Sequence, residues 1–173
     1  MRPLLGFVVV LGLASGCQPA PQAAGPSAAP SAAASAADQA FIDGMVPHHE
    51  GAVMMANEAL AKATREELRA FARQVRIDQG AEVAQMKAWR LAWFGSSRTP
   101  PMDHSTHQVA GSGAAYDAAW CTAMVVHHEG ALTMSADALK AATRPEVREL
   151  AQRIIAAQER EIGQLKAWAQ AWR

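Results

Sequence analysis

The chain has 173 residues, with 16 basic and 16 acidic side chains and no net charge at neutral pH. This balance argues against nucleic acid as a partner, because nucleic-acid-binding domains normally carry a basic excess. Half of the residues are hydrophobic. Alanine supplies much of that share, which favours helices that pack closely.

The N-terminal segment 1–17 resembles a bacterial lipoprotein signal. Met1-Arg2 gives a positive start, the apolar run 4–13 is too short to span a bilayer, and small residues precede Cys17. We therefore expect cleavage before Cys17, a lipid on its thiol, and a mature protein anchored in the cell envelope, facing the periplasm or the exterior. The alternative is an ordinary secretion signal in which Cys17 is incidental.

Residues 18–37 form a low-complexity stretch of proline, alanine and serine. Such a segment has almost nothing to bury, so we expect a disordered tether between the membrane and the folded domain. Without Cys17, Cys121 is the only remaining thiol, and the mature chain cannot form an internal disulfide.

The rest of the chain is an internal repeat, in which the same helical hairpin occurs twice. Residues 41–60 align with 120–139 without a gap, and the offset stays constant beyond them, so that His48 corresponds to His127. Apolar periodicity predicts helices over 38–61 and 65–94 in the first copy, and over 116–140 and 144–172 in the second. We assign the hairpins to 38–94 and 114–173 and a loop to 95–113. Two such hairpins can bury their apolar faces in an all-α four-helix bundle.

Two short patterns predict where the second helix of each hairpin begins. Thr64-x-x-Glu67 and Thr143-x-x-Glu146 both match the capping box, in which the threonine hydroxyl caps the helix.

Histidine and methionine are not scattered through the sequence. All six histidines lie in three places, 48–49, 104–107 and 127–128, and the seven methionines after the initiator lie in or opposite those places. Imidazole and thioether groups together select soft or borderline transition metals, copper above all.

Each histidine pair belongs to a Met-x-x-His-His-Glu-Gly segment. On a helix, the methionine lies one turn from both histidines, and all three face the apolar side. The glutamates that follow, Glu50 and Glu129, should face solvent or the bundle edge, and Met54 should lie outside the cluster. On the second helices, Glu82 and Glu161 are either acceptors for the histidine pairs or ordinary solvated side chains.

Three further features leave alternatives open. Cys121 replaces Ile42 of the first copy, either as an additional thiolate ligand or as a small buried hydrophobe. The loop residues Met102, His104 and His107 form either an open copper-capture motif or a polar loop. Pro47, which has no counterpart in the second copy, can kink its helix.

The segment Met-Val-Pro-His-His-Glu-Gly-Ala-Val-x-Met-Ala, followed by Gln-x-x-Glu-x-x-x-Met-Lys-x-Trp, resembles the bacterial domain of unknown function 305 family. The resemblance covers about 38–94 and 116–173. It implies a ferritin-like four-helix shape, export, and binding of copper, expected as Cu(I). It carries metal-ligand roles to Met45, His48, His49, Met55, Glu82 and Met86, and to Met124, His127, His128, Met134 and Glu161. Leu165 stands where the pattern has methionine, so the two copies are unequal.

The favoured hypothesis is a lipid-anchored copper-binding protein that buffers copper, confers tolerance or delivers it, with copper-handling proteins as possible partners. One alternative is a structural or interaction lipoprotein whose histidines form a polar core. Another is a di-iron enzyme. Such an enzyme needs Glu-x-x-His motifs, and neither histidine pair has a glutamate three residues before it. We therefore expect no enzymatic activity.

Overall fold

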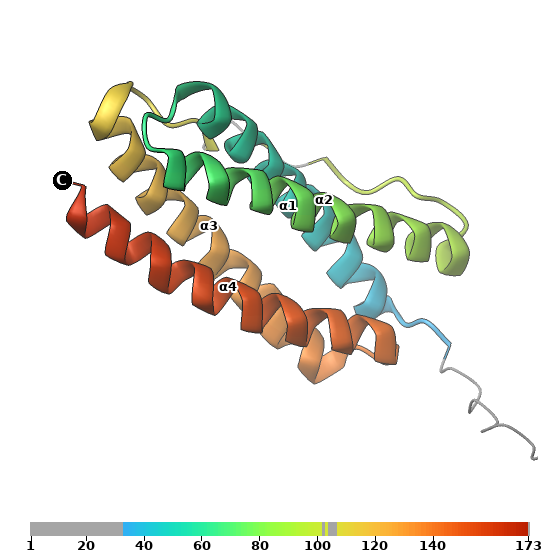
Figure 1. Cartoon of the computed structure of the whole chain (residues 1–173). Helices are drawn as coiled ribbons and strands as arrows, with labels where there is room; N and C mark the ends of the chain where they lie inside the picture. Colours follow the sequence, from blue (N-terminus) through green and yellow to red (C-terminus); the bar gives the residue numbers. More distant parts are fainter. Residues whose placement is uncertain (1–32, 102, 104–106, 173) are drawn as a thin grey trace, which may run out of the picture. The chain divides into compact units, whose positions relative to one another are not determined.

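Four long helices make up the folded part of the chain in the computed structural model, which describes residues 33–101, 103 and 107–172 (Figure 1). They are α1 (Ala36–Lys62), α2 (Glu66–Phe94), α3 (Gly113–Ala141) and α4 (Pro145–Ala171). The predicted all-α, four-helix fold is confirmed, and the predicted helix bounds differ from these by only a few positions at either end. None of the described helices is long and apolar enough to cross a membrane.

The predicted signal over 1–17, with Cys17, lies outside the described residues, as does most of the tether. The tether prediction extended slightly too far, because α1 already begins at Ala36. Ser35 is its N-cap and forms a capping box with Asp38, in which each side chain bonds to the backbone N–H of the other residue.

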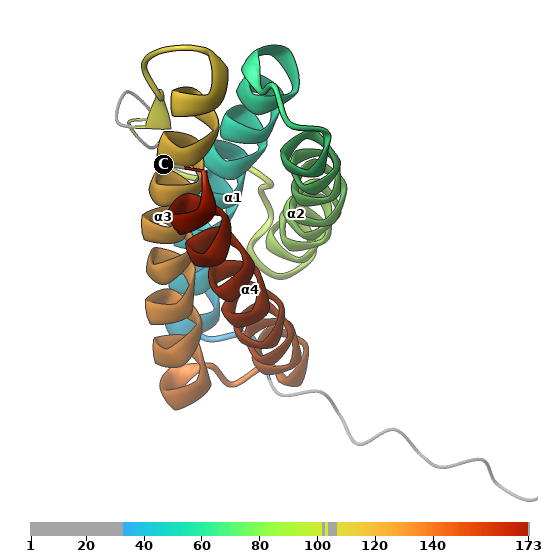
Figure 2. The same cartoon turned by 60° about the vertical axis from the view of Figure 1, so that its left-hand side comes forward.

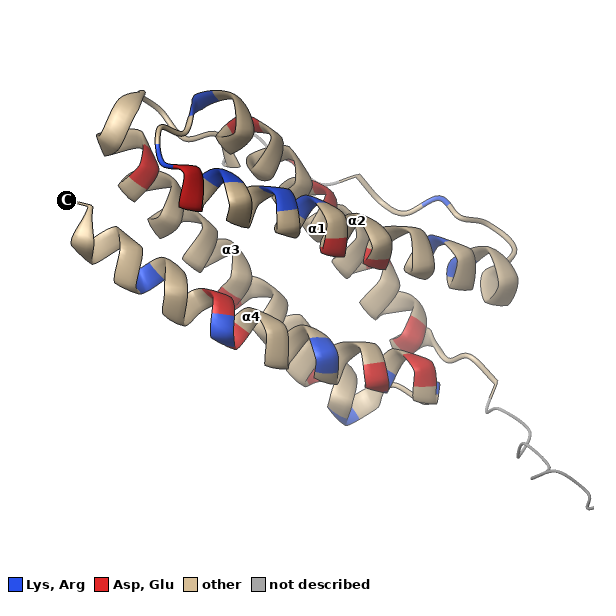
Figure 3. Cartoon of the chain, viewed as in Figure 1, with Lys and Arg blue, Asp and Glu red and all other residues tan. Residues whose placement is uncertain are grey.

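The helices pair as two hairpins, α1 with α2 and α3 with α4, and the hairpins meet mainly where α1 packs against α3. Figure 2 shows α2 beside α1 and α4 beside α3. Acidic and basic residues are interspersed along α2 and α4, which fits helices with one face in solvent (Figure 3). The centre of the molecule is therefore the contact between α1 and α3.

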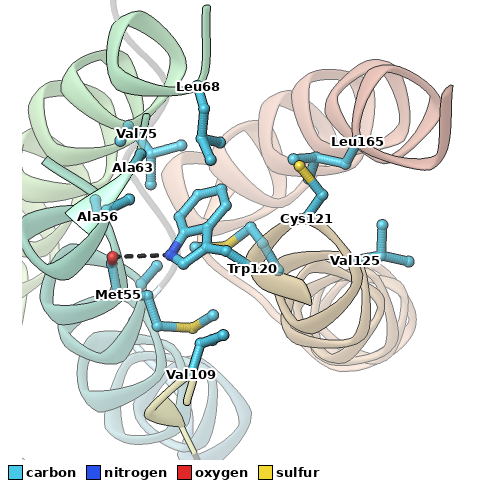
Figure 4. Packing of buried hydrophobic residues seen from close by; sticks show 14 of the residues in the cluster. Met55, Ala56, Ala63, Leu68, Val75, Val109, Trp120, Cys121, Val125 and Leu165 are labelled. Carbon is cyan, nitrogen blue, oxygen red and sulfur yellow. Dashed lines mark hydrogen bonds between the residues drawn. The ribbon is translucent and has the colours of Figure 1, made fainter. Parts of the chain in front are cut away.

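Two apolar clusters lie on either side of this centre. The first, here called the Trp120 core, includes Met55 and Met124, and the Trp120 indole N–H donates to the Met55 carbonyl oxygen over 2.9 Å (Figure 4). The second, the Met45 core, contains Met45 and Met86. Along α1 and α3, the histidine pairs fall between the residues of the two cores.

A buried aspartate from each hairpin caps the second helix of the other. Asp117 of α3 accepts hydrogen bonds from the backbone N–H groups of Thr64 and Arg65, both at 3.0 Å, and from the Thr64 hydroxyl at 2.6 Å. Asp38, its counterpart in the first copy, accepts the equivalent bonds from Thr143 and Arg144. A carboxylate at a helix N-terminus also interacts favourably with the helix dipole.

The capping-box predictions for α2 and α4 were therefore wrong. The N-caps are Arg65 and Arg144, and neither makes a side-chain capping bond. Thr64 and Thr143 donate their hydroxyls to the aspartates of the other hairpin, so a tertiary contact replaces the local one.

The same arginines bind tryptophans of the opposite hairpin. The Arg65 guanidinium lies 4.6 Å from the Trp172 ring centroid, and that of Arg144 lies 4.3 Å from Trp93. Each of these tryptophans stacks on the tryptophan one turn before it in its helix. Cation–π contacts of this kind add to the aspartate bonds, so the hairpins hold each other at both ends.

We expect Asp117→Ala to lower the free energy of unfolding by about 3 kcal/mol, because it leaves buried N–H and hydroxyl donors without an acceptor. Urea denaturation followed by circular dichroism measures this. Asp137→Ala is the control, since Asp137 is largely exposed and pairs with Lys140, three residues further along the same helix. Equal stability of Asp117→Ala and the wild type would contradict the role given to the aspartate.

The same carboxylates should make the fold sensitive to acid. Burial raises the pKa of Asp117, but hydrogen bonds from Thr64 and Arg65 outweigh it, and the pKa is lowered overall. A carboxylate with a lowered folded-state pKa stabilises the fold above its unfolded-state pKa of about 3.9, and this contribution is lost as the pH falls further. Urea midpoints measured from pH 6 down to pH 3 should therefore drop less in Asp117→Asn than in the wild type.

Candidate metal centre

His48 of α1 and His127 of α3 face each other where the two hairpins meet. Their ring centroids are 3.9 Å apart, with the planes inclined at 42°. The close approach depends on Gly130 of α3, because a Cβ atom there would lie 2.9 Å from His48 Nε2. The glycine of the repeated motif thus makes room for the imidazole of the other hairpin.

Nitrogen atoms of this pair are buried without partners. Among the described residues, three of these atoms have no hydrogen-bond partner: both ring nitrogens of His127, and Nδ1 of His48. Most buried polar groups in proteins are hydrogen-bonded, and an unpaired one costs about 1–3 kcal/mol. The arrangement is therefore costly for the fold alone and leaves nitrogen lone pairs available to a ligand.

Both imidazoles are held in the neutral state. Burial, helped by the neighbouring His49 and His128, lowers the pKa of His48 to about 3. Burial, with His48 next in importance, lowers the pKa of His127 to about 2. Neutral imidazole is the form that binds metal ions, so no proton has to leave at neutral pH.

The second histidine of each pair is fixed by a glutamate of its own hairpin. His49 Nε2 lies 2.8 Å from Glu82 Oε2, and His128 Nε2 lies 2.7 Å from Glu161 Oε2. Of the two sequence interpretations for these glutamates, the structure therefore favours the acceptor role. A carboxylate can only accept, so Nε2 carries a hydrogen, and in the neutral form of the ring Nδ1 then has the lone pair. Both Nδ1 atoms are buried and lack partners in the described part of the chain. Carboxylate–histidine pairs commonly orient metal-binding imidazoles in this way.

A pocket of about 390 Å³, here called the inner pocket, opens beside the His48–His127 pair. Met55 of α1 and His107 of the interhelical loop line it together with both histidines, and the His107 ring centroid lies 5.0 Å from that of His127. One thioether and three imidazoles, contributed by both hairpins and the loop, therefore surround one space.

The loop is held against α1 by two contacts that sequence reasoning missed. Val109 is buried in the Trp120 core, close to Met55 and Trp120 (Figure 4). Its backbone N–H donates to Glu58 Oε2 over 3.4 Å. These contacts place His107, which shortly precedes Val109, and a single valine in a polar loop gave no periodic signal that could predict them.

The other predicted ligands are divided between the two cores. Met45 and Met86 are buried in the Met45 core, and Met124 is buried in the Trp120 core. Met134 packs on α1, with its sulfur 3.4 Å from where a Cβ of Gly44 would lie. The remaining two loop candidates, Met102 and His104, lie outside the described residues.

Cys121 is buried in the Trp120 core, beside Leu165 and Val125 (Figure 4). Burial, with Asp117 as a further cause, raises the pKa of its thiol to about 12. A protonated buried thiol behaves as a small hydrophobe, so the structure favours that alternative over a thiolate ligand. At Pro47, α1 continues without interruption.

The residues predicted to face outward do so. Glu50 pairs with Lys87 and Glu129 with Lys166, each near the surface. The Met54 side chain is 49% exposed.

The chemistry that this centre offers is that of neutral imidazoles with nearby thioethers. In the described ranges, no three His, Cys, Asp or Glu side chains already converge as a metal site. A cation bound here would combine imidazole nitrogen with thioether sulfur. Such a donor set suits Cu(I) and similar soft ions rather than Mg²⁺ or Ca²⁺, which prefer oxygen.

Solved structures of several related proteins are similar to this chain. The Cu(I)-bound form of CopM is 37% identical with a TM-score of 0.70, and the match covers 78% of this chain and 96% of that one. The Cu(II)-bound form of CopM is 38% identical with a TM-score of 0.69, covering 79% and 98%. A DUF305 fragment from Deinococcus radiodurans, 23% identical with a TM-score of 0.68 and covering 81% and 99%, shares the fold.

No curated protein sequence matches the chain significantly. The profile of the family described as Domain of unknown function (DUF305) matches residues 22–90, 38–117 and 117–173, so the two copies are both recognised. With most of its length covered by this profile and by the CopM structures, the chain belongs to the DUF305 family.

Proposed function

We propose that this chain is an exported copper-binding protein that binds Cu(I) in the cell envelope and buffers it, confers tolerance or delivers it to copper-handling proteins. The observation that carries the proposal is the buried His48–His127 pair, with unpartnered ring nitrogens, beside Met55 and His107. The proposal is of a binding protein rather than an enzyme.

The similarity to CopM supports a copper-related function. Structures of CopM exist in Cu(I)-bound, Cu(II)-bound and Ag-bound forms. Silver ion is a soft monovalent cation like Cu(I), and the mixture of imidazole and thioether in the present chain suits both.

The place of action follows from the sequence before the fold. The signal-like segment 1–17 and the Pro/Ala/Ser stretch after it support export, with a lipid on Cys17 holding the domain at the membrane. The metal ion and the membrane are then the two direct partners.

The alternative is a structural lipoprotein in which the histidines are only a polar core. The His49–Glu82 and His128–Glu161 bonds favour it, because they satisfy one nitrogen of each ring without a metal. A ligand that binds only the folded state must raise its stability. A melting temperature that does not respond to Cu(I) or Ag(I) would therefore favour this alternative.

We expect the double variant His48→Leu/His127→Leu to bind Cu(I) at least about 100-fold more weakly, because it removes two ligands and leaves their surroundings apolar. Anaerobic titration against a competing Cu(I) chelator measures this affinity.

The metal-free double variant should be as stable as the wild type or more so, since unpaired buried nitrogens are replaced by hydrocarbon. Urea denaturation of the apo proteins provides this check, and it separates loss of the site from loss of the fold. Wild-type affinity in a folded double variant would refute the proposal.

The close contact at Gly130 can be altered without removing any proposed ligand. In Gly130→Ala, the new Cβ should displace the His48 ring and weaken Cu(I) binding about tenfold, although every ligand remains. Gly163→Ala is the matched control, because a Cβ there meets nothing within 4 Å. The control should gain up to about 1 kcal/mol of stability from helix propensity and keep its affinity. Equal Cu(I) affinities in the two variants would show that the His48 position does not matter.

A further inference from the structure

A second, larger pocket adjoins the inner pocket and shares two of its residues. This outer pocket, of about 710 Å³, is lined by Met54, Met55, Glu58, Lys62 and His107, with the loop segment 108–110 after it. Met55 and His107 also line the inner pocket that holds His48 and His127. These two side chains therefore lie at the boundary between the outer pocket and the inner pocket.

Met54 is unusual among the methionines that the structure describes. Its side chain is 49% exposed, whereas the adjacent Met55 is 2% exposed. The position equivalent to Met54 in the second copy is Thr133, which offers no sulfur. The first copy therefore has an exposed thioether at this position and the second copy does not. It is the first copy's thioether that shares a pocket with His107 of the loop.

The charges of the outer pocket nearly cancel. Glu58 accepts from the Lys62 ammonium group over 2.6 Å, so its carboxylate is neutralised by a cation at the same place. Hard cations, which need several oxygen ligands, find little to bind here. The groups that can bind a soft cation are the two thioethers and the His107 imidazole.

We propose that the outer pocket is the path by which a soft monovalent cation reaches and leaves the buried site, with Met54 as its first and last protein ligand. This inference rests on the proposed function. The ion passes from Met54 to Met55 and His107, and then to the His48–His127 pair. Each step exchanges one neutral donor for another, so the charge of the ion does not change and no proton moves.

A donor that binds the ion only in passing affects rates rather than equilibrium. It lowers the barrier equally for entry and release, so the dissociation constant stays the same while both rate constants rise. This separates Met54 from the residues of the buried site, whose loss lowers affinity.

The test is the rate at which Cu(I)-loaded protein loses its ion to excess chelator, followed anaerobically by stopped flow. Met54→Leu keeps the volume of the side chain but removes its sulfur, and the release rate should fall about tenfold. The equilibrium affinity should stay within about twofold. Met54→Thr, which copies the second repeat, should behave like Met54→Leu. Met54→His restores a suitable donor and should restore the rate.

Ile77→Thr is the control for loss of an exposed apolar side chain, because Ile77 lies on α2 and is 58% exposed. It should leave the release rate unchanged. An unchanged rate in Met54→Leu would overturn the path. A parallel loss of affinity would also overturn it, because Met54 would then be a resident ligand. Failure of the wild-type protein to bind Cu(I) would instead refute the proposed function itself.

Discussion

The candidate site depends on the contact of α1 with α3, which places the His48 and His127 rings against each other where the two hairpins meet. It brings two neutral imidazoles together and leaves ring nitrogens of both without partners in the described part of the chain. Each unpaired nitrogen costs about 1–3 kcal/mol. The apolar cores on either side and the aspartate caps at both ends offset this cost. Contacts between the hairpins on both sides of the imidazoles, along α1 and α3, therefore hold the two rings in place.

The duplication explains this arrangement and also its limits. Asp38 and Asp117 occupy equivalent positions in the two copies and make the same cap, so each hairpin completes the other. The interhelical loop, however, occurs only once. It brings His107 beside Met55, whereas Met134, the counterpart of Met55, packs on Gly44 instead. One repeated motif thus acquires two different surroundings.

The features that could be predicted from the sequence are those that depend on the spacing of residues within one segment. Periodicity and the repeat gave the helices and the inward face of His48, because both are properties of a single segment. The Thr64 capping box failed because Asp117, distant in sequence, competes for the same donor groups. A helix projection likewise shows which face of its helix Met55 occupies. It does not show that Met55 shares a pocket with His127 of the other hairpin. The position of His107 depends on tertiary contacts of the loop, which have no local signature.

Tight retention and rapid exchange of a metal ion place different demands on a protein. Retention favours rigid, buried, neutral donors, which the α1–α3 contact supplies in His48 and His127. Exchange favours donors that solvent can reach, and Met54 is the exposed thioether next to that site. Because the two sets share only the boundary residues Met55 and His107, affinity and rate can be altered separately. In the proposed function, the duplicated helices would therefore supply the affinity, and the single loop between them would make the two sides of the site unequal.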